Sequence, residues 1–196
     1  IVICRNQDGS SRIYFYDPDT HTSSEATGYT PIGVTAQSRP VFSKDGKRLY
    51  IIHKGWNFIS AYDYDPVSHQ LTGETPEFAG LKTDTARDHA DGTGAEARFA
   101  YPEWGCCDDA GNLYVADSWN HCIRKVTPEG VVTTLAGMPT PNVETNTDTF
   151  ANGKLAESVF SRPMGICMDS KGNFYVAEEG FADIRKITIG NEPENE

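Results

Sequence analysis

Short runs of hydrophobic and β-branched residues, separated by polar turns, follow one another along this chain. LYVA at 113–116, CIRKV at 122–126 and VVTTLA at 131–136 have the length and composition of strands. The turns between them are rich in Asp, Asn and Gly, the residues that close β-hairpins, as in DAGN at 109–112. No stretch keeps the period of about 3.6 residues that predicts an amphipathic helix. The pattern therefore predicts an all-β protein of short antiparallel strands.

The chain repeats itself, and the repeat predicts its architecture. Residues 99–127 and 160–188 align without a gap at an offset of 61 residues (160 − 99). The matches include Pro102 with Pro163, Gly111 with Gly172, Tyr114 with Tyr175 and Arg124 with Arg185. A weaker copy, at an offset of 64 residues, places Leu49, His53, Trp56 and Ile59 opposite Leu113, Asp117, Asn120 and Ile123. Repeated four-stranded sheets of this kind are typical of a β-propeller, whose blades bury each other's faces.

The repeat divides the chain into propeller blades of up to four antiparallel strands. IVIC at 1–4 and RIYFYD at 12–17 are interpreted as the first two strands of the first blade. We predict a partial blade over 1–36, a degenerate blade over 37–81, a blade with a long preceding loop over 82–137, an incomplete blade over 138–189 and a tail over 190–196.

Four motifs resemble the NHL repeat, a family that builds six-bladed β-propellers. They are DG-x-G-x-x-A-x-F-x-x-P before the first strand of a blade, D-x-x-GN-[LF]-YVA, NHCIRK and VTTLAG. They cover 91–137 and 152–189, whereas FSKDGKRLYII at 42–52 resembles propellers of the YVTN or TolB style. The resemblance implies about four blades of an intact six. The remaining blades, or an N-terminal domain, are then expected outside this chain, with Ile1 and the final NEPENE as cut edges.

The order of AG, long polar loop, DG, A-x-F and Pro is also similar to secreted or surface lipoproteins of gut anaerobes. Those proteins carry an IPT/TIG immunoglobulin-like domain ahead of an NHL propeller, and no such domain is visible in this chain. The similarity implies an extracytoplasmic location, at the cell surface or in the periplasm, and carbohydrate-related surroundings. Because these residues contain no targeting signal, the location is expected from the resemblance alone.

Charge and composition narrow the choice of partners. The chain has 17 Lys and Arg against 28 Asp and Glu, a net charge of −11, which repels the phosphate backbone of nucleic acids. No run approaches the roughly 18 apolar residues that a membrane span needs. The cysteines are odd in number and form no CxxC, so we expect free, buried thiols and leave one disulfide open. These residues are Cys4, Cys106, Cys107, Cys122 and Cys167.

The densest cluster of chemical groups is Asp117, Asn120, His121 and Cys122. The repeat partners of these four residues are Glu178, Phe181, Ala182 and Asp183. The chemistry of the cluster is therefore not repeated, whereas its place between two strands is. Asp and Asn side chains bond nearby backbone in such turns. We predict that Asp117 and His121 shape a β-hairpin turn and bind no metal.

The alternative is a propeller hydrolase or lyase that holds calcium or another divalent metal in its channel. Ligands for such an ion come from the innermost strands. These strands read PVFSKDG, EWGCCDD and MGICMDS, contain no histidine, and place Asp45, Asp108 and Asp169 where a carboxylate caps the following turn. No G-x-S-x-G or similar nucleophile motif is present. We assign no catalytic residue, metal ligand or cofactor, and rank an enzyme below a binding protein.

Aromatic residues in hairpin turns favour a binding role. Trp56, Trp119 and Phe181 lie in corresponding turns of three blades and are expected on the face that also carries the long loops between blades. They form either a platform for a ligand or, with equal weight, rings that each cover the edge of their own blade.

Trp104 departs from the repeat, because its partner in the next copy is Gly165. It is interpreted as a ligand contact or as a plug for the channel. Its expected neighbours are Tyr101, Glu103 and Arg162, with Arg39 at the corresponding place in the earlier blade. The sequence therefore predicts an extracytoplasmic binding or scaffold module for a glycan or a partner protein on the loop-rich face.

Overall fold

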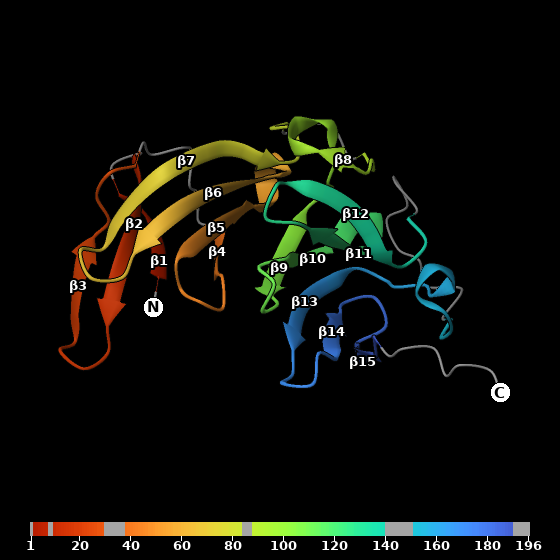
Figure 1. Cartoon of the computed structure of the whole chain (residues 1–196). Helices are drawn as coiled ribbons and strands as arrows, with labels where there is room; N and C mark the ends of the chain where they lie inside the picture. Colours follow the sequence, from red (N-terminus) through yellow and green to blue (C-terminus); the bar gives the residue numbers. More distant parts are fainter. Residues whose placement is uncertain (1, 8–9, 30–37, 84–87, 140–150, 190–196) are drawn as a thin grey trace.

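The computed structural model describes residues 2–7, 10–29, 38–83, 88–139 and 151–189, with side chains from Arg12 onward. These residues form β-strands and short 3-10 turns, and no α-helix occurs among them (Figure 1). No helix in the described ranges is long and apolar enough to cross a membrane. The prediction of an all-β protein is confirmed.

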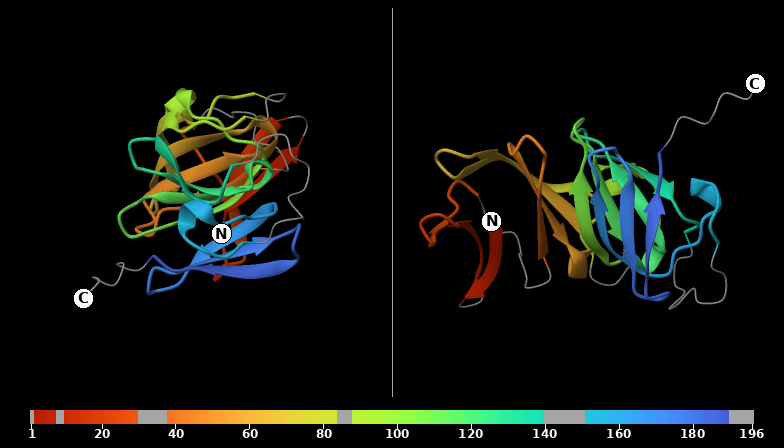
Figure 2. Two further views of the ribbon diagram at one scale, coloured as in Figure 1. Left: turned by 90° about the vertical axis from the view of Figure 1, so that its right-hand side faces the viewer. Right: turned by 90° about the horizontal axis from the view of Figure 1, so that it is seen from below.

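The strands form four antiparallel sheets, here called blades 1 to 4, which follow one another in chain order (Figures 1 and 2). Blade 1 contains β1 (Val2–Gln7), β2 (Ser10–Asp17) and β3 (Thr22–Glu25). Blade 2 contains β4 (Ser38–Phe42), β5 (Arg48–His53), β6 (Phe58–Asp65) and β7 (Gln70–Ala79). Blade 3 contains β9 (Pro102–Cys107), β10 (Leu113–Asp117), β11 (Cys122–Val126) and β12 (Val131–Ala136). Blade 4 contains β13 (Pro163–Met168), β14 (Phe174–Glu178) and β15 (Asp183–Ile187).

Short 3-10 turns stand in two kinds of connection. η1 (Lys54–Trp56) and η3 (Ser118–Asn120) join the second and third strands of blades 2 and 3. η2 (Gly94–Glu96) and η4 (Leu155–Glu157) precede blades 3 and 4 in the chain. The first kind shapes the central hairpins, and the second kind shapes the links between blades.

Blade 3 has a fifth strand, β8 (Gly92–Thr93), which the sequence pattern did not predict. It pairs with Val131 and Val132 of the outer strand β12. A strand of this length is too short to show an alternating pattern. It forms because the link before blade 3 folds back along β12, which is a long-range contact that local propensity does not report.

Hydrophobic clusters join neighbouring blades, and three of them are found among the described residues. Between blades 3 and 4 the cluster brings Tyr114, Ala116 and Ile123 against Phe174 and Val176. All five side chains are 5% exposed or less. Fully burying one large apolar side chain contributes about 1.5–3 kcal/mol, so blade stacking stabilises the chain strongly. The first strands of successive blades, β1, β4, β9 and β13, contact one another in turn, as the strands around a propeller axis do.

The Gly that follows the outer strands of blades 2 and 3 has a steric cause. Gly80 and Gly137 have φ of 87° and 99°. A Cβ atom would lie 2.7 Å from the Asn57 carbonyl oxygen at Gly80 and 2.8 Å from the His121 carbonyl oxygen at Gly137. Glycine avoids both the strained φ and this contact. The end of each outer strand therefore packs directly against the central hairpin turn of its own blade.

Candidate functional site

The central hairpin turns of blades 2 and 3 bind the blade that follows. Asn57 and His121 end these turns in the left-handed conformation, with φ of 58° and 55°. The Tyr101 backbone N–H donates to Asn57 Oδ1 at 2.8 Å, and the Arg162 backbone N–H donates to His121 Nδ1 at 3.2 Å. His121 thus accepts through Nδ1 and carries its proton on Nε2 when neutral. Each bond fixes the first residues of one blade beside the turn of the blade before it.

Four side chains gather where blades 3 and 4 meet, and we call Trp119, Tyr101, Arg162 and Glu179 the Trp119 cluster. The Tyr101 and Trp119 ring centroids are 5.2 Å apart, with an interplanar angle of 35°. The Arg162 guanidinium carbon lies 5.0 Å from the Trp119 ring centroid, within cation–π range. Arg162 Nη1 lies 3.3 Å from Glu179 Oε2. All four residues are at least partly exposed, so two aromatic rings, a cation and a carboxylate face solvent together.

The backbone holds the Trp119 cluster in place. The Trp119 N–H donates to the Ala100 carbonyl and the Glu179 N–H donates to the Arg162 carbonyl, each at 3.0 Å. Tyr101 and Arg162 both have φ of 51°, a conformation that non-glycine residues adopt only when their surroundings enforce it. The cluster is therefore prearranged by the contact between two blades and does not depend on a long loop.

Two of the other predicted site residues have cationic partners of their own. The Trp56 ring carries Lys82, whose Nζ lies 5.2 Å from the ring centroid. Glu103 is only 5% exposed and is ion-paired with Lys54 of η1. A ligand would have to displace Lys54 to reach this carboxylate. Trp56 and Trp119 thus stack with different partners, each with the cation that follows or adjoins its own turn.

Trp104 is 43% exposed and lines an apolar groove of about 480 Å³ beside blade 4. The groove is lined by residues of β13, β14 and β15, among them Gly165, Cys167, Tyr175, Ala177 and Ile184. Tyr101, Glu103 and Arg162, the neighbours expected from the sequence, are not among its lining residues. Arg39 on β4 and Phe181 in the turn after β14 are both partly buried.

The polar centre of blade 3 is a buried ion pair that the sequence analysis missed. Asp117 and Arg124 are both fully buried, with Asp117 Oδ2 3.0 Å from Arg124 Nη1. Asp117 also accepts hydrogen bonds from the Ala100 N–H at 2.8 Å and from Asn120 Nδ2 at 2.9 Å. Burial raises the pKa of Asp117, against the lowering effect of the guanidinium and the two donors. Burial lowers and Asp117 raises the pKa of Arg124, with a net shift upward.

The prediction that Asp117 bonds local backbone was wrong. Its side chain does not cap the following turn, and instead bonds the backbone of Ala100, which lies 17 residues earlier. The reason is that β10 ends at the blade's centre and points this carboxylate towards the link that enters the blade. Recurrence of an acid and an arginine at the 61-residue offset, Asp117 with Arg124 and Glu178 with Arg185, was the signal that could have revealed it.

Blade 4 repeats the tie with Glu178 and Arg185. Arg185 Nη1 lies 3.3 Å from Glu178 Oε1, and Glu178 Oε2 accepts the Ser161 N–H at 2.6 Å. Arg185 Nη2 donates to the Ala151 carbonyl and to Asn152 Oδ1 at 2.8 and 2.9 Å. Burial raises the pKa of Glu178. These acidic residues are therefore structural ties between strand and link.

The prediction for the carboxylates after the inner strands is confirmed. Asp108 Oδ1 accepts the Asn112 N–H at 2.8 Å, and Asp169 Oδ1 accepts the Asn173 N–H at 2.9 Å. Hydrogen bonds from Asn173 are the largest cause that lowers the pKa of Asp169 to about 2. These side chains cap turns, as expected.

Residues 4–147, well over half of the chain, match the family described as the SMP-30/Gluconolactonase/LRE-like region. The chain belongs to this family. It is also 33% identical over 154 residues to the protein SUPPRESSOR OF QUENCHING 1, chloroplastic, of Arabidopsis thaliana. Human NHL repeat-containing protein 2 is 37% identical over 102 residues. These matches cover 78% and 50% of this chain but only 14% and 13% of the relatives.

Solved structures agree with this family and with the NHL-type propeller that the motifs predicted. Auxiliary nutrient binding proteins of Bacteroides thetaiotaomicron and Bacteroides ovatus are each 26% identical, with TM-scores of 0.71 and 0.72. The alignments cover 90% and 93% of this chain, and 42% and 46% of those chains. A virginiamycin B lyase of Staphylococcus aureus, 19% identical with a TM-score of 0.54, shares the fold. The chain therefore spans less than half of a propeller of this type.

The nucleophiles described in this SMP-30/gluconolactonase/LRE-like chain are shielded or weakly reactive. Burial raises the pKa of both Cys106 and Cys107 to about 12. His53 contacts Ser60 Oγ at 2.9 Å, but both are buried, and burial lowers the pKa of His53 to about 3. The Cys106, Cys107, Cys122 and Cys167 thiols are free, and Cys167 is exposed, contrary to the expectation of buried thiols. The Cys4 side chain lies outside the described part of the chain.

Metal ligands were sought among the same side chains. Within the described ranges, no group of three or more His, Cys, Asp and Glu side chains is placed to hold an ion.

Proposed function

We propose that this chain is an extracytoplasmic ligand-binding module and that the Trp119 cluster holds a glycan. The observation that carries the proposal is the stack of Tyr101, Trp119 and Arg162, which is partly exposed and held by backbone hydrogen bonds. A flat ring accepts the apolar C–H face of a sugar, while Arg162 donates to and Glu179 accepts from its hydroxyl groups. A protein partner on the same face is the competing ligand.

Similarity to the two Bacteroides auxiliary nutrient binding proteins supports a binding role, since each alignment covers at least 90% of this chain. It also supports the extracytoplasmic location, because nutrient capture takes place outside the cytoplasm. The cluster lies at a blade junction, which is a usual place for ligands in propellers and at other element interfaces. The blades beyond this chain would complete the face around it.

Glycan-array screening followed by calorimetry tests this proposal. Trp119→Ala is expected to weaken binding of the array's best glycan about tenfold, because a lost stacking contact of about 1.4 kcal/mol corresponds to that factor. Trp119→Phe retains a ring and should restore most of the affinity. Val67→Ala, an exposed apolar residue in the hairpin at the other end of blade 2, is the matched control and should leave affinity unchanged.

Two outcomes contradict the proposal. Binding that Trp119→Ala and Trp119→Phe leave unchanged would move the ligand away from the cluster. Trp104→Ala then tests the apolar groove beside blade 4, the other predicted place for a ligand. An array without any saturable glycan would argue for a protein ligand.

A hydrolase or lyase that uses a divalent metal is the second candidate, favoured by the family description, which names a gluconolactonase. Gluconolactone hydrolysis by this chain, dependent on added Ca²⁺ and abolished by a chelator, would favour it over the binding module.

A further inference from the structure

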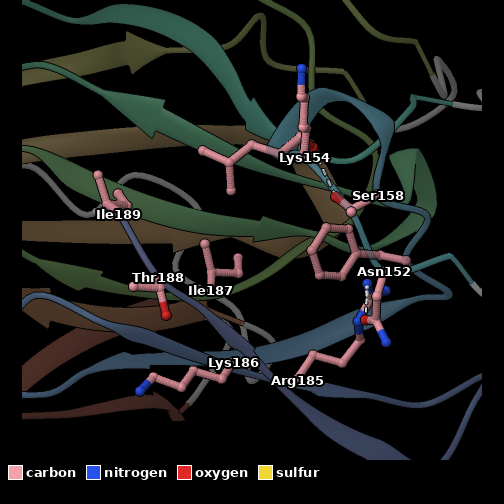
Figure 3. Close-up of a pocket in the computed structure, with 11 residues that line it drawn as sticks. Asn152, Lys154, Ser158, Arg185, Lys186, Ile187, Thr188 and Ile189 are labelled. Carbon is pink, nitrogen blue, oxygen red and sulfur yellow. Dashed lines mark hydrogen bonds between the residues drawn. The ribbon is translucent and has the colours of Figure 1, made fainter. Parts of the chain in front are cut away.

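A cavity of about 600 Å³ lies along the outer edge of β15 in blade 4 (Figure 3). One wall is the strand and its extension, residues 185–189, and the other is the link formed by residues 152–155. Ser158 and Phe160 also line it. Within the described ranges β15 pairs with β14 alone, so the backbone groups of its other edge face this cavity.

Blade 3 contains the same place with a strand in it. There β12 lies between β11 and β8, with Val132 opposite both Val126 and Gly92. The 61-residue offset maps β11 onto β15 and β8 onto Gly153–Lys154. Both flanking elements of the strand are therefore present in blade 4, and the cavity occupies the position of β12.

The walls of the cavity are held as they are around β12. In blade 3, Arg124 Nη2 donates to the Ala90 carbonyl at 2.7 Å and to Asp91 Oδ1 at 2.8 Å. In blade 4, Arg185 Nη2 makes the corresponding bonds to the Ala151 carbonyl and Asn152 Oδ1 at 2.8 and 2.9 Å (Figure 3). The slot is thus prearranged, which lowers the cost of binding a strand there.

The strand in blade 3 indicates which residues the slot accepts. Val132 is 1% exposed and packs in the cluster that contains Phe99 and Val126, and their partners Phe160 and Ile187 line the slot. Two positions further on, the N–H and hydroxyl of Thr134 donate to Asp91 at 3.2 and 3.0 Å. Asn152 replaces Asp91 in blade 4 and still offers a carbonyl oxygen. A Val or Ile followed two residues later by Thr therefore fits.

The chain's own next residues have a different composition. At the same offset, the residues opposite 131–135 of β12 are 192–196, which read EPENE and lie outside the described part of the chain. Pro193 stands opposite Val132 and has no N–H for a ladder, and glutamates are poor strand formers. The occupant that fits the slot is therefore a different polypeptide segment.

We propose that the slot beside β15 is a peptide-binding site that takes one extended strand of another polypeptide, with the Val-x-Thr pattern of β12. The peptide adds as a fourth strand to blade 4, so main-chain hydrogen bonds to β15 supply affinity and the Phe160–Ile187 side supplies specificity. Lys154 and Lys186 beside the slot favour an acidic residue next to the strand, as Glu129 stands before β12.

Fluorescence anisotropy with a labelled peptide EGVVTTLAG, the sequence of residues 129–137, tests the proposal. We expect saturable binding to the 196-residue chain, and at least tenfold weaker binding of a peptide with Val132→Pro, which lacks the N–H. Hydrogen exchange of the Asp183–Ile187 amides should slow when the first peptide is added. Absence of binding, or equal binding of the two peptides, would overturn the proposal.

A chain that carries its own strand provides the second arm. Replacing residues 191–196 with EGVVTTLAG should fill the slot from within, raise the midpoint of unfolding and abolish binding of the added peptide. Peptide binding that this variant retains would place the peptide elsewhere and overturn the proposal. Trp119→Ala should bind the peptide as the unchanged chain does, so failure of the glycan site and failure of the strand site can be told apart.

Discussion

Blades 3 and 4 have the same polar ties at a spacing of 61 residues, but their surroundings differ. Blade 3 has five strands and a neighbour on both faces, whereas blade 4 has three strands and one described neighbour. Arg124 is fully buried and Arg185 is 8% exposed. Local sequence thus reproduces each tie, and the neighbouring strands determine how completely it is buried.

The outer faces of the two blades show the same difference in their apolar residues. Ile123 lies opposite Ala116 in blade 3, and Ile184 lies opposite Ala177 in blade 4. Ile123 is fully buried because blade 4 covers it, whereas Ile184 is 73% exposed. Equivalent positions in a repeat therefore differ in energetic weight by what lies against them. This difference can be tested with pairs of matched substitutions.

Removing the central arginine should have the largest effect. Arg124→Met leaves Asp117 buried without its partner, and we expect the free energy of unfolding to fall by about 3–5 kcal/mol. Arg185→Met should cost less, because Glu178 borders the open side of blade 4. Urea denaturation of both variants measures the difference, and equal losses would mean that the neighbouring strands do not matter to the tie.

Truncating the outer-face isoleucines should have the next largest effect. Ile123→Ala removes a side chain from the cluster between blades 3 and 4 and should cost about 2–4 kcal/mol. Ile184→Ala should change the free energy of unfolding by less than about 0.5 kcal/mol, since the side chain is mostly in water. A large loss at Ile184 in the same denaturation experiment would show that another copy or segment covers this face.

The hairpin acceptor should have the smallest effect of the three. His121→Ala leaves the Arg162 N–H without its acceptor, and we expect a loss of about 1 kcal/mol. His121→Asn should recover stability, because Asn57 accepts the Tyr101 N–H in the corresponding turn of blade 2. Ala182→Asn, at the equivalent position of blade 4, is the control and should have little effect. Thermal unfolding followed by circular dichroism compares these variants, and a His121→Asn variant as unstable as His121→Ala would contradict the role.

The sequence predicted the fold better than it predicted the site. Alternating runs and the 61-residue repeat were enough for antiparallel blades, because strand pairing within a blade joins neighbours in the chain. The repeat also placed Asp108 and Asp169 correctly, since a turn cap needs only nearby backbone. Contacts between blades were harder, because they depend on residues that are far apart in sequence.

Particular residues show where sequence reasoning failed. Glu103 was expected to be an open ligand contact, but Lys54, which lies 49 residues earlier (103 − 54), covers it as an ion-pair partner. Trp104 was expected beside Tyr101, but the groove it lines belongs to blade 4. Tyr101, Trp119 and Arg162 were each suspected, yet their stacking could not be read from spacing alone.

The sequence by itself determined the strands, their order and the equivalence of positions between blades, because period, turn residues and self-similarity are local properties. Tertiary structure alone decided which equivalent residue is buried, which aromatic rings stack, and that the place of β12 is open in blade 4. The physical reason is that burial and edge pairing are set by whatever lies against a face or strand. That neighbour is supplied by another blade, so the residues of one repeat cannot specify it.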